Sequence, residues 1–351
     1  MISPALFTVA RCPECRIALA PQPPGAACPT CRRVFDGSRG YLDLRPIEAF
    51  AEQTKYLDEA LHVDARHETV APPLLGSKIR NDQLRAFLAL APGDRVVDLG
   101  CGSGRAMIWN RDTGASFTGI DISAFFASES LDECDLLLGD LRRLPLADAS
   151  FNKAWSLDVL EHLSPQALHD MLAEANRVLT DGGAMFVYTH VRKNGPLALG
   201  VRLVNRLGGL LHRLGLLDLG TERLRKSDHL NPIADHEDLR RVAAAAGFEV
   251  ERITYYTPII GAFVENILTR MAEQFMARRS RTAGAGGAGA DPGTAVRAAR
   301  KDAKARLRKR GPVYWATRAA TGLMYLDVLL WGRFSSGPFF ARLRKVPRAT
   351  P

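Results

Sequence analysis

The chain has 351 residues, and 46% of them are hydrophobic, which is enough for one full α/β domain with additions or for two modest domains. The net charge of +9 is uneven, because residues 270–351 hold 18 Lys and Arg against 4 Asp and Glu. Any anionic partner, a membrane surface or a nucleic acid, is therefore expected there first. The N-terminus lacks the basic and apolar regions of a signal peptide, which predicts a cytoplasmic protein.

Four of the six cysteines form a C-x2-C-x12-C-x2-C pattern, made by Cys12, Cys15, Cys28 and Cys31. Each C-x-x-C turn presents two thiolates, so the spacing favours a tetrahedral zinc site, with a disulfide pair as the alternative. Residues 1–46 are then a small module that zinc stabilises. Residues 33–37 and 40–46 are predicted to be short strands of this ribbon, around a turn. A cysteine ribbon ending in GYLDLRP resembles the N-terminal element of the zinc-ribbon rRNA guanine methyltransferases.

Residues 47–92 are predicted to be a helical segment, since apolar residues recur at helical spacing. Such a segment either covers a cofactor cleft or packs on the first strand of the domain that follows. Pro92-Gly93-Asp94 then separates it from that strand.

The centre of the chain alternates strands and helices from residue 95 to residue 190. Apolar runs without alternation predict strands buried on both faces of a parallel sheet, at 96–99, 117–121, 136–139, 151–156 and 184–190. The clearest helix is 165–179, capped by Ser164 and ended by Asp181-Gly182-Gly183. This order predicts a doubly wound α/β fold, whose ligands bind at the carboxyl ends of the strands.

A glycine-rich turn follows the first of these strands, with glycines at 100, 102 and 104, and Asp121 lies about 20 residues further on. Strand, glycine turn, helix and a later acidic residue together predict a nucleoside site in which the Asp121 carboxylate accepts both ribose hydroxyls. A dinucleotide-binding dehydrogenase would explain the glycine turn alone, but not the later segments.

Five segments, VVDLGCGSGR, GIDIS, GDLRRLPLADASFN, SLDVLEHL and RVLTDGGAMFV, resemble the class I S-adenosylmethionine-dependent methyltransferases, of the type 11 kind. The resemblance implies a seven-stranded sheet whose last strand is antiparallel. It also implies that Asp98 and Gly100–Gly104 hold the methionine end of the cofactor, with Asp121 on the ribose. The adenine would lie against Ile122 and Asp140, and the predicted cofactor-binding set is completed by Cys101, Leu141 and Leu157.

Acidic residues and histidines follow the fourth strand, where the acceptor of the methyl group is expected. If the turn is helical, Asp158, Glu161 and His162 share one face, and His162 would serve as a base. His229, in a polar loop, is a second candidate base. The segment also resembles the acidic and histidine segment of ubiquinone-biosynthesis O-methyltransferases, where such residues bind a divalent metal. A catalytic base, a metal site and a structural role all remain open.

Two insertions are predicted around the core at 93–256. The first, a cap at 191–232, contains the leucine-rich stretch 197–219 with interspersed arginines, which predicts either a basic amphipathic element on a membrane or a cap packed on protein. The second, 257–336, contains helices, a flexible loop at 281–294 and a basic helix at 295–309. Its apolar stretch 313–331 is close to spanning length, but Arg318 and Asp327 favour packing or interfacial binding. Residues 337–351 form the last strand and the tail.

The sequence therefore predicts a cytoplasmic methyltransferase that uses S-adenosylmethionine, contains structural zinc and associates peripherally with the inner face of the membrane. The expected acceptor is a hydrophobic or amphipathic small molecule of the lipid, quinone or glycolipid type. A base in rRNA or tRNA is the alternative, and it predicts a salt-dependent affinity for RNA. A cofactor-binding scaffold without catalysis is a further alternative.

Overall fold

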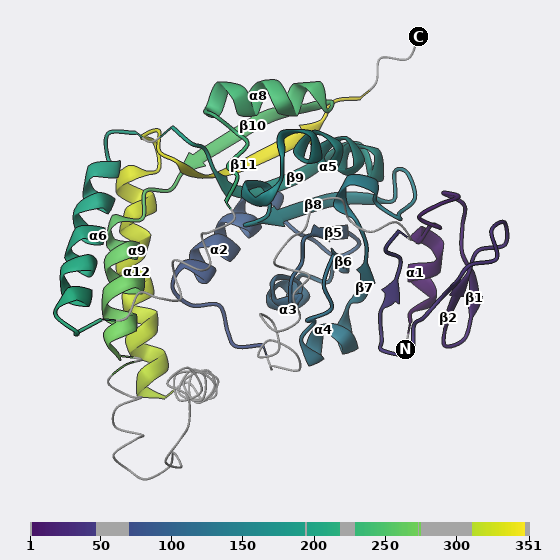
Figure 1. Ribbon diagram of the computed structural model, residues 1–351, viewed down its shortest axis with the longest axis horizontal. Coiled ribbons are helices and arrows are strands. Elements are labelled where there is room, and N and C mark those ends of the chain that lie inside the picture. Colours follow the sequence, from purple (N-terminus) through teal and green to yellow (C-terminus); the bar gives the residue numbers. More distant parts are fainter. Residues whose placement is uncertain are drawn as a thin grey trace.

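The computed structural model describes residues 2–46, 70–193, 195–217, 229–272, 274 and 311–347. Within these residues, eight strands form one mixed sheet in the order β10-β11-β9-β8-β5-β6-β7-β4 (Figure 1). The strands from β4 to β9 are parallel, and β11 is antiparallel to both β9 and β10. The strands are β4 (Leu42–Asp43), β5 (Arg95–Leu99), β6 (Ser116–Asp121), β7 (Asp135–Leu138), β8 (Phe151–Leu157), β9 (Leu179–His190), β10 (Phe248–Tyr255) and β11 (Pro338–Lys345). The predicted seven strands and the antiparallel last strand are thus confirmed, and β4 is an addition.

Strand β4 corrects the prediction for the N-terminal module. The ribbon's own sheet consists of β1 (Ala20–Gln22), β2 (Gly25–Ala27) and β3 (Val34–Phe35), after a short helix α1 (Pro4–Val9). Instead of joining that sheet, Leu42 pairs in parallel with Leu137 of β7, and the Leu44 amide donates to the Leu138 carbonyl at 2.9 Å. Leu42 and Leu44 are completely buried, in a core that residues of the ribbon and of the large sheet form together.

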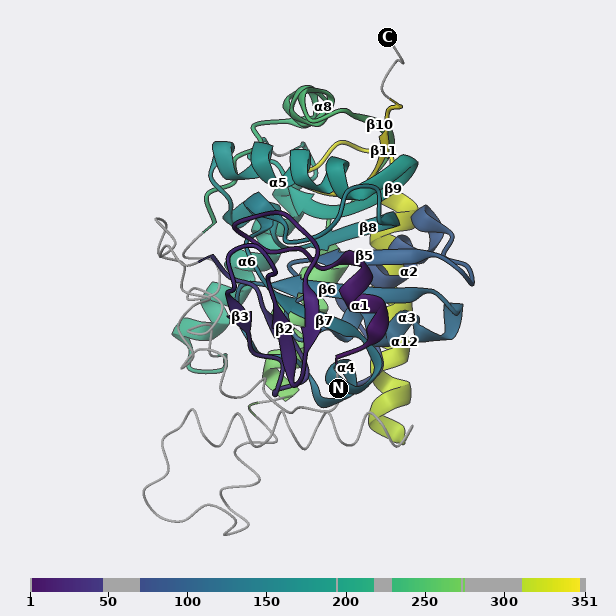
Figure 2. The same cartoon turned by 90° about the vertical axis from the view of Figure 1, so that its right-hand side faces the viewer.

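Helices cover both faces of the sheet, so the predicted doubly wound arrangement is confirmed (Figure 2). Val97 and Leu99 pack in the same core as the helices α5 and α8, whereas Val96 packs in the core of α2 and α3. Alternate residues of β5 therefore face opposite layers, as expected for a strand buried on both sides. The helices of these layers are α2 (Gly76–Leu88), α3 (Arg105–Asn110), α4 (Ser128–Glu133), α5 (Pro165–Val178) and α8 (His236–Ala245).

The helix α5 begins as predicted, since the Ser164 hydroxyl accepts a hydrogen bond from the Ala167 amide at 3.3 Å. Its predicted end at residue 179 agrees with the structure within one residue, but the predicted stop at Asp181–Gly183 was wrong. The helix ends at Val178, and β9 begins at once, so the Asp181–Gly183 turn lies inside a strand. The turn forms a bulge in β9, because the register of the pairing between β8 and β9 shifts at this point. Gly182, in the bulge, has a φ of +70°.

Three helices lie side by side beyond one end of the sheet: α6 (Ala198–Arg213), α9 (Ile259–Phe263), which continues into a π-helical turn at Val264–Leu268, and α12 (Pro312–Trp331) (Figure 1). The carboxylate of Asp327 on α12 is buried and accepts the amides of Ile260 and Gly261 at 3.0 and 2.7 Å. Packing of 313–331 against the described part of the 259–279 segment, residues 259–272, is thus confirmed. None of the described helices is long and apolar enough to cross a membrane.

Several predicted elements fall outside the described residues. They are residues 47–69 of the predicted cover segment, the loop 281–294 and the basic helix 295–309. Of the segment 47–92, the described part contains the helix α2, which packs against the sheet and against α12.

Candidate active site

The glycine turn after β5 is held in a conformation that requires glycine. The φ angles of Gly100, Gly102 and Gly104 are +81°, +54° and +78°, in the left-handed region. A Cβ atom at Gly100 would lie 2.4 Å from Cγ2 of Val159, so the turn and the segment after β8 are in close contact. The amide of Gly100 donates to the carbonyl of Ile120 at 2.9 Å, which fixes the turn to β6.

Asp121 ends β6 directly beside this turn. Its Oδ2 atom accepts the amide of Gly102 at 2.8 Å, and its Oδ1 atom accepts the amide of Ser123 at 3.0 Å. Burial raises the pKa of this carboxyl above 3.8, although the amide donors oppose the shift. The sequence predicts that the glycine turn and Asp121 form one nucleoside site, and the structure joins the two by a hydrogen bond.

Asp98 provides a second buried carboxyl at the same turn, one residue before the end of β5. Its side chain is surrounded by protein, and the residue is 3% exposed. Burial, with a smaller contribution from the negative charge of Asp121, raises the pKa of Asp98 to about 7. A cationic ligand placed beside this carboxyl would lower its pKa again.

The other predicted cofactor residues lie at the same edge of the sheet, because each one ends or follows a parallel strand. Asp140 follows β7, accepts the amide of Arg142 at 2.9 Å and forms an ion pair with its guanidinium at 2.9 Å. The predicted set at this edge also contains Cys101, Ile122, Leu141 and Leu157, after or at the ends of β5, β6, β7 and β8.

Glu161, His162 and His229, which the sequence proposed for catalysis, form one cluster. Their possible ligand atoms all lie within 4.8 Å of one another, and the rings of His162 and His229 are 4.8 Å apart. Glu161 is buried, and burial together with the charge of Asp158 raises its pKa to about 7. The structure also adds a histidine that sequence reasoning missed, because the ring of His190 lies 5.2 Å from that of His229.

Asp158 does not share a face with Glu161 and His162, which corrects the prediction of a helical turn. Its φ is +57°, and the 3-10 turn begins only at Leu160. The carboxylate turns to Arg80 of α2 and forms an ion pair with it. The guanidinium of Arg80 lies over the ring of Tyr188, 5.2 Å from its centre. The sequence did not indicate a role for Arg80, because it is one of several basic residues on a predicted helix.

Residues 97–187, which contain the glycine turn, both acidic residues and the turn at Leu160–His162, match a family model described as a methyltransferase domain. This segment is a class I S-adenosylmethionine-dependent methyltransferase domain. The match leaves the cysteine ribbon and the two insertions outside it.

Curated relatives are similar to part of the chain that contains the methyltransferase domain. Methyltransferase GfsG of Streptomyces halstedii is 28% identical over 160 residues, which are 41% of this chain and 57% of that protein. The 24-methylenesterol C-methyltransferase 2 of Oryza sativa subsp. japonica is 26% identical over 184 residues, 50% of this chain and 46% of that protein. The chain thus spans about half the length of these relatives.

Among solved structures, phosphoethanolamine N-methyltransferase 2 of Haemonchus contortus in complex with S-adenosyl-L-methionine aligns with 84% of this chain and 59% of that one. The sequence identity is 15% and the TM-score is 0.48.

The four cysteines outside the methyltransferase domain form two turns of the same shape. In each turn the amide of the second cysteine donates to the sulfur of the first at 3.4 Å, from Cys15 to Cys12 and from Cys31 to Cys28. The residue after each turn, Arg16 or Arg32, has a left-handed φ, +61° or +60°. All four sulfurs lie within 4.8 Å of one another, and none of them forms a disulfide. The donor set therefore fits one tetrahedral metal ion.

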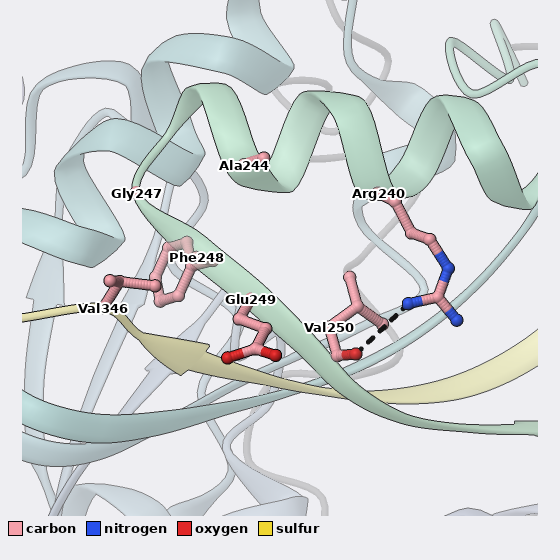
Figure 3. A pocket seen from close by; sticks show the side chains of 7 residues that line it. All are labelled: Arg240, Ala244, Gly247, Phe248, Glu249, Val250 and Val346. Carbon is pink, nitrogen blue, oxygen red and sulfur yellow. Dashed lines mark hydrogen bonds between the residues drawn. The ribbon is translucent and has the colours of Figure 1, made fainter.

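A hollow of about 480 Å³ lies elsewhere, between α8 and the outer strand β10 (Figure 3). Arg240 lies at one end of it and donates to the carbonyl of Val250 at 3.3 Å. None of the predicted site residues lines it, and β10 is separated from β5 by β11, β9 and β8. This hollow is distinct from the site at the glycine turn.

Proposed function

We propose that the chain transfers a methyl group from S-adenosylmethionine to a hydrophobic or amphipathic small molecule at a membrane surface. The methyltransferase domain supports the choice of S-adenosylmethionine as the methyl donor. An exposed face of α6 that combines leucines with arginines supports the proposed class of acceptor. The sulfonium already activates the methyl group, so the chain has chiefly to align donor and acceptor and to manage the acceptor's proton.

The residues at the glycine turn fit this donor. The cationic methionine end of S-adenosylmethionine would lie beside the buried carboxyl of Asp98, whose pKa is raised by burial and would be lowered by a neighbouring cation. Asp121 would accept the ribose hydroxyls, and Ile122 and Asp140 would contact the adenine. At Gly102 the space beside the backbone is open, so the ligand can approach the turn closely there, whereas Val159 and Ser130 fill the space beside Gly100 and Gly104.

The relatives support a small hydrophobic acceptor. Their names specify a 24-methylenesterol, a sterol and a demethylrifamycin as the molecules they methylate. These acceptors differ in the atom that receives the methyl group, so the relatives support a class of acceptor and leave the atom open.

The helix α6 carries its apolar residues on the outside. Residues spaced four, four, three and four positions apart lie on one side of a helix, and here they are Leu199, Leu203, Leu207, Leu210 and Leu214, which are 42% to 62% exposed. The adjoining side has the exposed residues Arg202, Arg206 and Arg213. We call these eight residues the leucine–arginine face. Gly200 and Gly208 lie on another side of the helix, against Ile259 and Ile267 of the neighbouring segment.

An anionic lipid surface fits this face better than a second copy of the chain. Residues 198–213 contain no Asp or Glu, so two copies of the face would bring arginines together without a compensating carboxylate. Leucines that enter the headgroup region beside arginines that meet lipid phosphates are typical of helices that lie in a membrane interface.

The acceptor class is tested by incubating the full chain with methyl-labelled S-adenosylmethionine and either a total lipid extract or total RNA of the source cells. We expect label in the organic phase and none in the RNA. Label in RNA would support nucleic-acid methylation instead. If neither fraction is labelled while the cofactor binds, the non-catalytic scaffold is the better description. The Asp121→Ala variant is the control for labelling that does not depend on the donor site.

Membrane binding is tested by co-sedimentation of the full chain with phosphatidylcholine vesicles that contain or lack phosphatidylglycerol. An arginine near an anionic surface contributes about 1 kcal/mol, so reversing Arg202 and Arg206 to Glu is expected to weaken binding at least about tenfold. The double variant Leu203→Gln with Leu210→Gln should weaken binding to a similar extent, and to both kinds of vesicle. The matched controls are Arg241→Glu on α8, whose side chain is 79% exposed, and Val34→Gln on the ribbon.

Equal sedimentation of the wild type with and without vesicles would contradict the proposed binding to a membrane surface. Self-association of the wild type that both double variants abolish would show that a second copy covers the leucine–arginine face instead.

We further propose that Cys12, Cys15, Cys28 and Cys31 bind structural zinc. The two matching turns and the close set of four sulfurs support this. With four thiolates the ion has no open position for a substrate, so its contribution is to the stability of the ribbon.

A further inference from the structure

Four side chains that can ligate a metal gather where β8 and β9 end. Glu161 and His162 follow β8, His190 ends β9, and His229 lies in the segment before α8. Within this group, possible ligand atoms of Glu161, His162 and His229 all lie within 4.8 Å of one another, and Nδ1 of His190 is 3.9 Å from Oε1 of Glu161. We call these four residues the histidine–glutamate cluster.

Main-chain hydrogen bonds hold the parts of this cluster together. The carbonyl oxygen of Glu161 accepts the amides of both Leu230 and Asn231, at 2.8 and 2.9 Å, so the segment with His229 is fixed to the turn with His162. The Thr189 hydroxyl donates to Oε2 of Glu161 at 2.8 Å. The other carboxylate oxygen therefore remains directed toward His190. Such support orients ligands before a metal binds.

We propose that the histidine–glutamate cluster binds a divalent transition-metal ion of the zinc, cobalt, nickel or iron type. Glu161, His162 and His229 bring together one carboxylate and two imidazoles, a donor set that such ions prefer, whereas magnesium and calcium prefer oxygen ligands. His190 adjoins the carboxylate of Glu161 and supports this set from beside it. Asp158 does not belong to the set, because it pairs with Arg80. The four residues of the cluster therefore come from three separate segments of the chain, and two of them, the ligand His229 and the supporting His190, lie outside the D-x-x-E-H segment.

The site lies next to the predicted donor site. Val159, two residues before Glu161, contacts Gly100 of the glycine turn. A cation at the cluster would thus be placed to hold a heteroatom of the acceptor near the transferred methyl group and to lower the pKa of an acceptor hydroxyl. An imidazole nitrogen that ligates a metal cannot accept a proton, so His162 and His229 would act as ligands and not as free bases.

The test is a titration of the metal-free full chain with Co²⁺, followed by optical spectroscopy. Cobalt bound by the four cysteines gives intense thiolate-to-cobalt charge-transfer bands, and cobalt bound by imidazoles and a carboxylate gives only weak d–d bands. We expect the wild type to bind one equivalent of each kind. His229→Ala and His190→Ala should retain the charge-transfer bands and lose affinity for the second equivalent by at least about tenfold.

His169→Ala is the matched control, because its side chain is 49% exposed on α5 and lies outside the cluster. Glu161→Gln keeps the shape of the side chain and removes its charge, so it provides a second test if a histidine variant does not fold. A wild type that binds only the thiolate-type cobalt, or cluster variants that bind both equivalents as the wild type does, would overturn the proposal. Because the readout is bound metal, this result is independent of whether methyl transfer is observed.

Discussion

Replacing Asp121 with alanine is expected to weaken the binding of S-adenosylmethionine about 100-fold or more. The carboxylate accepts two amides of the free protein, from Gly102 and Ser123, and it is the predicted acceptor for both ribose hydroxyls. A hydrogen bond to a charged group contributes about 1.5 to 3 kcal/mol, so the loss of two such bonds is enough for the expected change in affinity. Isothermal titration calorimetry of the full chain with the cofactor measures it directly.

Asp132→Asn is the control for this variant, since Asp132 is an exposed residue of α4, after the same strand β6. Asp121→Asn separates charge from shape, because the amide can still accept a hydrogen bond through its oxygen. It is expected to bind the cofactor with an affinity between those of the wild type and the alanine variant. If Asp121→Ala, folded by circular dichroism, binds the cofactor as the wild type does, the assignment of Asp121 to the ribose is wrong.

The central sheet was predictable because its strands carry the signal in their own residues. A parallel strand between two helical layers needs apolar residues on both sides, and Arg95–Leu99 and Ser116–Asp121 therefore read as short apolar runs. The glycine turn was predictable for a similar local reason, since its backbone conformation requires glycine whatever surrounds it.

Features that depend on contacts between distant segments were not predictable. Strand β4 has two residues, and what makes it a strand is the free edge of β7, almost a hundred residues later. His190 resembles any other strand end until β8 and β9 are seen to be neighbours. His229 is joined to the cluster by main-chain bonds from Leu230 and Asn231, and main-chain bonds leave no trace in the choice of side chains.

A second contact between the ribbon and the methyltransferase domain, an antiparallel bridge between Ala10 and Leu146, leads to the second large effect. The Arg11 amide donates to the Pro145 carbonyl, and the Ala147 amide donates to the Val9 carbonyl, both at 2.8 Å. Arg16, directly after the first cysteine turn, donates to the carbonyl of Leu144 at 3.1 Å and pairs with Glu174 of α5 at 2.9 Å. The first cysteine turn therefore supports the segment that follows Asp140, which is predicted to contact the adenine.

Replacing Cys28 with serine is accordingly expected to lower the midpoint of thermal unfolding by on the order of 10 °C and to weaken cofactor binding. Structural zinc contributes about 10 kcal/mol or more to an isolated finger, and a loss of only a few kcal/mol here would produce this shift. Differential scanning calorimetry with and without S-adenosylmethionine measures both effects. Cys134→Ser, a cysteine outside the cluster, is the control. A Cys28→Ser protein that loses its metal but keeps the wild-type cofactor affinity would show that the ribbon folds separately from the adenine segment, in spite of the hydrogen bonds between them.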